Sequence, residues 1–219
     1  RLYEPQIKAL EKTFRIRTIV PTASRYETMV AEVLQQAPDE FAILGTSMGG
    51  RVALEVALAA PERVTGLCVI GAGAGPVADQ AAGLRRSERI RNGEREQVIS
   101  EMATMIAHEQ GPSGPSTRQA FVNMAMAMDA EQLARQSDAL AHRVNRWDEL
   151  EEVEALTLCL WGEHDKFSPA ADGLRLAEAV QMGSYVEIPD CGHFPTLEYP
   201  ELATEAILLW LEDIEDVEA

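Results

Sequence analysis

The 219 residues are enough for one domain, or for one domain with an inserted subdomain, and 46% hydrophobic residues can form a sizeable core. Asp and Glu outnumber Lys and Arg by 36 to 19, and the net charge of -17 argues against binding to nucleic acid backbones or to anionic membranes. No run of 18 apolar residues and no signal peptide is present, so we expect a cytoplasmic protein.

Short apolar runs rich in β-branched residues predict five strands. In chain order they are residues 15–20, 41–44, 64–70, 156–161 and 184–188. Helical patterns, beginning with PQIKALEKTF near the N-terminus, lie before and between the first three runs and between the last two. This alternation predicts an α/β fold with a mostly parallel sheet flanked by helices.

The alternation is interrupted by about seventy residues without a convincing strand. The stretches LRRSERIRNGEREQVISEMATMIAHE and RQAFVNMAMAMDAEQLARQSDAL have helical patterns, and GPSGPS at residues 111–116 predicts a loop between them. We therefore divide the chain into a first core part at residues 1–75, a helical insertion at 76–146 and a second core part at 147–219.

A candidate nucleophile follows the second predicted strand. The motif GTSMG places Ser47 between Gly45 and Gly49, after an apolar run and before a helix that Pro61 ends. Glycine and serine also occur in ordinary turns, which is the simpler interpretation. A strand, a sharp turn and a helix, however, form the setting in which GxSxG presents a nucleophilic serine, so we favour a nucleophile elbow.

A serine hydroxyl needs a base, and His193 is the favoured candidate. The sequence SYVEIPDCGHFP is a short strand followed by a loop, in which His193 can project from the edge of a sheet. His108 and His142 lie in the helical insertion, and His164 has no glycine before it at a strand end.

The acid that orients this base should follow another strand, and Asp165 in LTLCLWGEHDKFSP is the best candidate. Glu163 is a second possibility and Asp190 a weaker one, and Asp165 could instead cap the following helix. The chain order Ser47, Asp165, His193 is the nucleophile, acid, histidine order of α/β-hydrolases.

The cysteines do not indicate a redox or metal centre. Cys68 and Cys159 lie inside apolar strand-like runs, which favours small core residues, and neither they nor Cys191 show CxxC or metal-ligand spacing. We predict no metal ligands.

At this point the chain resembles the α/β-hydrolase superfamily over nearly its whole length. The blocks GTSMGG, GEHDKFSP and DCGHFPTLEYPE are similar to those around the three catalytic residues of that superfamily. Within it, the pattern resembles small serine esterases of the pimeloyl-ACP methyl ester carboxylesterase type, with lactonases and C–C hydrolases close behind.

The resemblance implies two features that the residues alone do not. Residues 76–146 would form a lid over the active site, and the oxyanion hole would use the backbone N–H of Met48 and one N–H from a loop after an earlier strand. That strand should precede the helix-like segment LYEPQIKAL, so we expect further residues upstream of Arg1.

We therefore expect a serine hydrolase that cleaves a carboxylic ester or a lactone of a small, partly apolar substrate, without a cofactor. The alternatives are an acyltransferase or C–C bond hydrolase with the same triad, and a non-catalytic protein of this fold that binds a small ligand. The sequence does not indicate whether the protein is a monomer or a homodimer.

The residues that contact the substrate are the least specified part of this prediction. Phe167 and Phe194, beside the catalytic candidates, could shape an acyl site, although core packing is an equal alternative. Met124 in the predicted lid could line an adaptable apolar pocket, while methionines there more often pack helix on helix.

Overall fold

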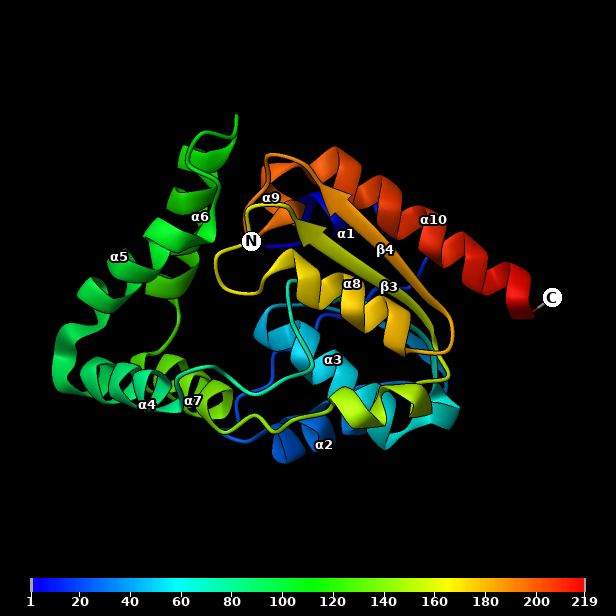
Figure 1. The fold of residues 1–219 in the computed structure, drawn as a ribbon, viewed down its shortest axis with the longest axis horizontal. Coiled ribbons are helices and arrows are strands. Elements are labelled where there is room, and N and C mark those ends of the chain that lie inside the picture. The colour runs from blue at the N-terminus through cyan, green and yellow to red at the C-terminus, as the bar shows by residue number, and fades with distance from the viewer. Residues whose placement is uncertain (1, 219) are drawn as a thin grey trace.

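A four-stranded parallel sheet forms the centre of the protein (Figure 1). The computed structural model describes residues 2–218, and the side chains of residues 2–216. The strands are β1 (Phe41–Thr46), β2 (Val64–Ile70), β3 (Leu156–Gly162) and β4 (Gly183–Ile188), and each is paired in parallel with the next. The predicted α/β fold with a parallel sheet is confirmed.

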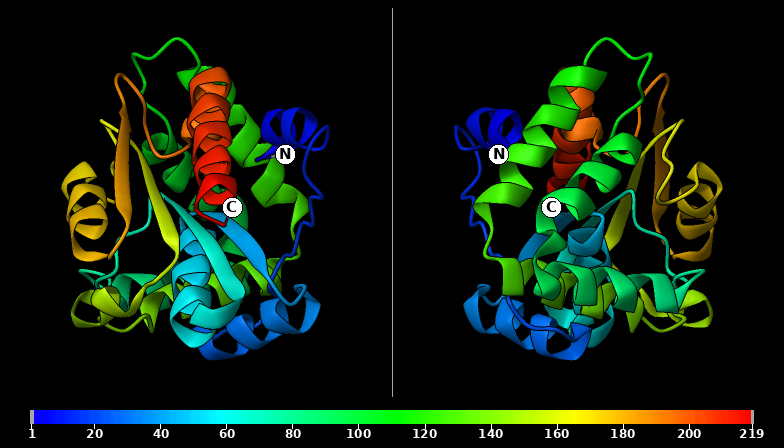
Figure 2. Two further views of the ribbon diagram at one scale, coloured as in Figure 1. Left: turned by 90° about the vertical axis from the view of Figure 1, so that its right-hand side faces the viewer. Right: turned by 90° about the vertical axis from the view of Figure 1, so that its left-hand side faces the viewer.

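Helices cover both faces of this sheet. The helices α2 (Tyr26–Gln36), α3 (Met48–Ala59) and α8 (Ala170–Ala179) pack on one face, and α1 (Glu4–Leu10) and α10 (Pro200–Glu218) on the other. Figure 2 shows α1 beside α10, across the sheet from α8.

Alternate residues of the strands serve the two faces. Leu67 and Val69 of β2 join the cluster under α3, whereas Cys68 and Ile70 join the cluster under α10. Both faces are apolar, as expected for a parallel sheet between helical layers. Cys68 and Cys159 are fully buried core residues, as expected, and burial raises the pKa of both thiols.

Three short helices lie at points where the chain changes direction, and two of them begin with proline. The 3₁₀ helix η1 (Pro61–Arg63) and α9 (Pro195–Glu198) begin with proline, whose missing N–H is not needed in a first turn. A second 3₁₀ helix, η3 (Trp147–Glu152), leads into β3.

The first predicted strand, residues 15–20, is wrong. These residues are extended but join no ladder with the rest of residues 2–218, so β1 is an edge strand there. A cavity of about 400 Å³, lined by Arg15, Ile16 and Arg17 on one side and by Phe41 to Gly45 on the other, separates the segment from β1. The segment has the apolar pattern of a strand without a neighbour close enough to bond.

Between β2 and β3 the described chain forms helices and no strand. Besides η3, these are α4 (Gln80–Arg89), the π-helical turn η2 (Ile90–Glu94), α5 (Arg95–Ile106), α6 (Gly114–Ala127) and α7 (Ala130–Ala141). We refer to the part of the chain from α4 to α7 as the α4–α7 segment. It projects from the sheet in Figure 1 and has its own small hydrophobic cluster, which includes Ile90, Ile99 and Leu133.

The loop predicted at residues 111–116 is only half right, because α6 begins at Gly114 and Pro115 fits its first turn. The bend that the sequence did not indicate lies at Gly93, where φ is +92° between α4 and α5. None of the described helices combines the length and the hydrophobicity that a membrane span requires.

Candidate functional site

Ser47 occupies a strained turn between β1 and α3. Its φ of 55° and ψ of -119° lie in a region that non-glycine residues rarely adopt. The turn is fixed by two backbone bonds, since the Ser47 N–H donates to the Ile70 carbonyl at 2.8 Å and the Ser47 carbonyl accepts from the Arg51 N–H at 3.0 Å. Met48 is the first residue of α3, so its N–H lies among the groups that have no acceptor in a preceding turn.

Close backbone contact explains one of the two motif glycines. A Cβ on Gly45 would lie 2.1 Å from the Gly49 carbonyl oxygen, whereas a Cβ on Gly49 would meet nothing within 4 Å. The second position that excludes a side chain is Gly50, where a Cβ would lie 2.9 Å from the Gly45 oxygen. The turn therefore needs small residues at 45 and 50, rather than at 45 and 49.

His193 and Asp165 form a buried hydrogen-bonded pair. The distance from His193 Nδ1 to Asp165 Oδ2 is 2.7 Å, and the two side chains are 2% and 0% exposed. The other carboxylate oxygen accepts the N–H groups of Phe167 at 2.8 Å and Ser168 at 3.0 Å. An acceptor held in this way favours the imidazole tautomer with its proton on Nδ1, which leaves Nε2 free to accept a proton.

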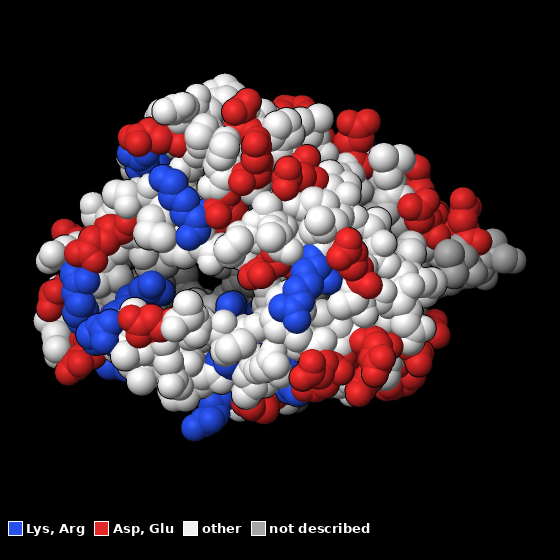
Figure 3. All heavy atoms as spheres, in the orientation of Figure 1, with Lys and Arg blue, Asp and Glu red and all other residues white. Residues whose placement is uncertain are grey.

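Ser47 and His193 line one cavity of about 190 Å³. It lies between the loops at the ends of the strands and the α4–α7 segment, which contributes Ala82, Leu140 and other residues. The space-filling view shows a dark opening between this segment and the core (Figure 3). The structure thus brings the three predicted residues to one region.

The other candidate acids lie elsewhere. Glu163 and Asp190 are exposed and lie beside His164, at 3.7 and 3.9 Å from its Nε2 atom. Neither carboxylate contacts His193 through a hydrogen bond or ion pair among residues 2–218.

Gly71, which the sequence analysis did not single out, packs against the buried pair. Its φ is +59°, and a Cβ there would lie 3.0 Å from Asp165 Oδ2 and 3.1 Å from His193 Nδ1. Any larger residue would therefore push the histidine from the aspartate. The sequence GAGAG offers no signal that distinguishes this glycine from its neighbours.

Glu198 of α9 was also missed, and it fixes the loop that carries His193. Its buried carboxylate accepts N–H groups from Gly192 and His108, both at 2.9 Å, and more weakly from Phe194 at 3.4 Å. Burial raises the pKa of this carboxyl, although the three N–H groups act in the opposite direction. The residue ties the histidine loop to the end of α5.

Arg51 connects the α4–α7 segment to the helix that follows Ser47. This fully buried guanidinium bonds to Glu55 at 2.7 Å and donates to the carbonyls of Ala74 and Val144, both at 2.7 Å. Ala74 precedes the segment and Val144 follows it. Both of its connections to the core are therefore held by one buried side chain.

The predicted substrate residues have different surroundings. Phe167 lines the cavity with its ring 5.0 Å from that of His193. Phe194 is buried and stacks on His193, with ring centroids 5.3 Å apart. Its ring centroid lies 6.1 Å from that of Phe121 in α6. Met124 is half-buried in α6 and is not among the residues that line the cavity.

Two arginines and one acid, Asp79, line the cavity, and Asp79 is paired with Arg85, so the charged lining is net positive in a chain with a net charge of -17. Arg86 and Arg143 both line it, and burial lowers the pKa of each guanidinium. Arg86 makes no ion pair or side-chain hydrogen bond within residues 2–218. Within the same residues, the Arg143 side chain donates one hydrogen bond, to the Pro76 carbonyl at 3.4 Å, and its buried Nε has no partner.

Comparison with known proteins indicates a family for this chain. Residues 15–206 match the sequence model of the alpha/beta hydrolase family. A curated relative, 2-hydroxy-6-oxononadienedioate/2-hydroxy-6-oxononatrienedioate hydrolase 1 of Pseudomonas putida, is 29% identical over 206 residues, which cover 89% of this chain and 72% of that protein.

Solved structures share the fold. A thermophilic esterase from Thermogutta terrifontis matches with a TM-score of 0.88 and 25% identity, over 97% of this chain and 85% of that one. The enol-lactonase from Burkholderia xenovorans LB400 matches with a TM-score of 0.85 and 19% identity, over 96% and 86% of the two chains.

Proposed function

We propose that this chain, which belongs to the α/β hydrolase family, is a serine hydrolase that cleaves a carboxylic ester or lactone of a small, partly apolar substrate. The observation that carries the proposal is that His193, in a buried pair with Asp165, lines the same cavity as Ser47, which is held in a strained turn. Such a constellation has the parts that acyl transfer to serine needs.

In the proposed mechanism, His193 Nε2 takes the proton of the Ser47 hydroxyl as its oxygen attacks the ester carbonyl. Asp165 keeps the proton on Nδ1 and stabilises the imidazolium that forms. The negative charge of the tetrahedral intermediate develops at the N-terminus of α3, where the Met48 N–H can donate to it.

The intermediate collapses when the C–O bond to the alcohol breaks and His193 returns its proton to the leaving oxygen. Water then attacks the acyl-serine, again with His193 as base, and releases the acid and the free Ser47. No step requires a cofactor.

We assign residues 76–146 the role of a lid, because the α4–α7 segment supplies one wall of the cavity. Phe167 would contact the acyl group from the core side. Phe194 would act through His193, on which it stacks, rather than through the substrate. Met124 would shape the lid from outside the cavity.

The two arginines indicate a substrate that carries a carboxylate. Arginine remains protonated in proteins, and a half-buried guanidinium without a partner is costly unless an anion completes its hydrogen bonds. Arg86 of α4 and Arg143 after α7 both face the space in which the substrate would lie. A carboxylate at the end away from the scissile bond would satisfy them.

A second candidate reaction is C–C bond hydrolysis on the same residues. The Pseudomonas putida relative is named for a hydroxy-oxo dicarboxylate, a compound without an ester, whose hydrolysis must break a bond between carbon atoms. Product analysis with a vinylogous 1,5-diketone acid and with a matched ester distinguishes the two activities.

A fluorophosphonate probe tests the proposed nucleophile. We expect stoichiometric labelling of Ser47 in the wild-type protein, located by peptide mass spectrometry, and no labelling in Ser47→Ala or His193→Ala. A folded wild-type protein that the probe leaves unlabelled would favour the non-catalytic ligand-binding alternative.

Matched substrates test the role of the arginines. With a monoester of glutaric acid, Arg143→Gln and Arg86→Gln should raise KM about tenfold or more, whereas KM for the corresponding ester amide should hardly change. The control is Arg85→Gln, because Arg85 neighbours Arg86 but its exposed side chain pairs with Asp79 at 3.2 Å. Equal effects on both substrates would show that the arginines do not read the carboxylate.

A further inference from the structure

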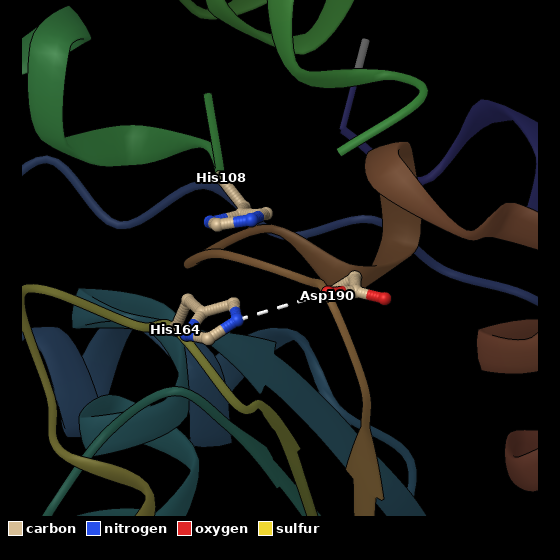
Figure 4. Close-up of side chains that lie close together, drawn as sticks. All are labelled: His108, His164 and Asp190. Carbon is tan, nitrogen blue, oxygen red and sulfur yellow. Dashed lines mark ion pairs between the residues drawn. The ribbon is translucent and has the colours of Figure 1, made fainter. Parts of the chain in front are cut away.

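A cluster of side chains that can ligate a metal lies outside the cavity of Ser47. Ligand atoms of His108, His164 and Asp190 all lie within 4.8 Å of one another. Within residues 2–218 this is the one group of three His, Cys, Asp or Glu side chains that meets this geometry. In Figure 4, His108 projects toward His164 from the connection after α5, and Asp190 lies beside them in the loop after β4.

The nitrogens of both imidazoles are available for a ligand. The two rings are stacked, with centroids 4.1 Å apart and an angle of 27° between their planes. No ring nitrogen of His108 or His164 makes a hydrogen bond with the described residues. The carboxylates of Asp190 and Glu163 lie 3.9 Å and 3.7 Å from His164 Nε2.

Backbone hydrogen bonds fix the positions from which these side chains project. The His164 N–H donates to the Cys191 carbonyl at 2.8 Å, the His108 N–H to Glu198 at 2.9 Å and the Asp190 N–H to Glu163 at 3.1 Å. The chain segments also touch, because a Cβ on Gly192 would lie 2.6 Å from the His108 nitrogen. The backbone positions of the three residues are therefore fixed by hydrogen bonds, while their side chains are half-buried or exposed and can rotate.

The spacing suits a transition-metal ion after small rotations. Zinc bonds of about 2.0–2.2 Å place two tetrahedral ligands roughly 3.4 Å apart. The distance of 3.9 Å between His164 and Asp190 is close to this value, and the widest separation of 4.8 Å needs a movement of the order of 1 Å. Imidazole together with carboxylate is a donor set for zinc, rather than for calcium or magnesium.

We propose that His108, His164 and Asp190 bind a divalent transition-metal ion of the zinc type, with Glu163 or water in the fourth position. The sequence showed no sign of this site, because the three residues are far apart in the chain and only the fold brings them together.

A metal ion at this position connects three parts of the molecule. His108 belongs to the α4–α7 segment, His164 precedes Asp165, and Asp190 lies in the loop that carries His193. The ion would therefore hold the segment against both loops of the buried pair. Because only the folded chain assembles the ligands, zinc should raise the melting temperature of the protein, and a chelator should reverse the effect.

Isothermal titration with zinc chloride tests the site in the purified protein after chelator treatment. We expect one ion per chain and an affinity weakened at least about tenfold in each of His108→Gln, His164→Gln and Asp190→Asn. Asparagine is the suitable replacement at position 190, where φ is +53°, since it tolerates that conformation. Cobalt should give a visible spectrum in the wild type that the His108 variant loses.

His142→Gln is the matched control, because His142 is an exposed histidine at the end of α7, away from the cluster, and should bind zinc like the wild type. Circular dichroism identifies any variant that does not fold. Because the three ligands come from separate segments, the variants that do fold still test whether the site binds zinc. The proposal would be overturned if both His108→Gln and His164→Gln bound zinc with an affinity within twofold of that of the wild type. The absence of saturable zinc binding to the wild type would also overturn it.

Discussion

The loops that carry Ser47, Asp165 and His193 differ from the α4–α7 segment in how they are held. Apart from the cavities they line, the loops are held by close buried contacts, as at Gly45 and Gly71, where even a methyl group would overlap its neighbours. The segment has a small cluster of its own and many surface ion pairs between arginine and acid, among them those of Arg89 and Arg91. The region that positions the reacting atoms is rigidly packed, whereas the region that covers them depends on weaker and screened interactions.

Asp165→Asn should have the largest effect on activity. An amide at this position no longer stabilises the proton on His193 Nδ1, so the wrong tautomer faces Ser47, and kcat should fall by about 10⁴-fold. The melting temperature should change little. Steady-state kinetics on an ester substrate measure the effect, and Glu163→Gln, two residues away and exposed, should retain the wild-type rate. A loss of less than tenfold in Asp165→Asn would assign the role to another acid.

Arg51→Met tests the buried connection between the two regions. Removal of the guanidinium leaves the buried Glu55 carboxylate with Arg146 as its remaining ion-pair partner among the described residues. It also removes the donor of the Val144 carbonyl, whereas the Ala74 carbonyl keeps the Arg146 N–H. We expect a loss of about 3–5 kcal/mol in the free energy of unfolding, measured in urea. A loss under 1 kcal/mol would mean that the segment does not depend on this residue.

Gly45→Ala tests the packing of the elbow. The added methyl group would overlap the Gly49 carbonyl, so the free energy of unfolding should fall by roughly 3 kcal/mol. Gly49→Ala is the matched substitution in the same motif, and it should be neutral or slightly stabilising, because its Cβ position is open and alanine favours the helix. Similar melting curves for the two variants would contradict the close approach.

Arg91→Met should have the smallest effect and depend on pH. Arg91 hydrogen-bonds to Glu131 and lowers the pKa of that carboxyl below its ordinary value of 4.5. Because the pKa of Glu131 is lowered in the folded protein, the pair contributes its full stability above the ordinary pKa of 4.5. It loses this contribution as the pH falls through the lowered pKa. Arg91 also bonds to Asp138, whose pKa is likewise lowered from 3.8. The melting temperatures of variant and wild type should therefore differ by about 2 °C or less at pH ~7 and by progressively less as the pH falls below about 4.

The sequence was most informative where chemistry follows directly from local pattern. The strand, turn and helix around Ser47 and the loops after β3 and β4 are readable because each strand is short, apolar and ended by glycine or polar residues. The α/β fold was predicted from the same kind of pattern, and the structure confirmed it. The catalytic assignments themselves remain predictions for the experiments above.

What the sequence did not indicate depends on contacts between distant residues. Arg51 and Glu55 are spaced like an exposed helical ion pair, and only the fold shows that they are buried beneath both ends of the α4–α7 segment. The extended segment at residues 15–20 has the pattern of a strand, but pairing requires a neighbour within bonding distance. The cluster around His108 has no local signature at all.

The long connection between β2 and β3 has a consequence for how the chain folds. About 85 residues separate Ile70 from Leu156, compared with about 20 between β3 and β4. Loop closure over the longer interval costs on the order of 1 kcal/mol more in chain entropy. We therefore expect β1 with β2, and β3 with β4, to assemble first as local units around α3 and α8. The central ladder of the sheet, between β2 and β3, should form last, after the α4–α7 helices have shortened the distance it must close.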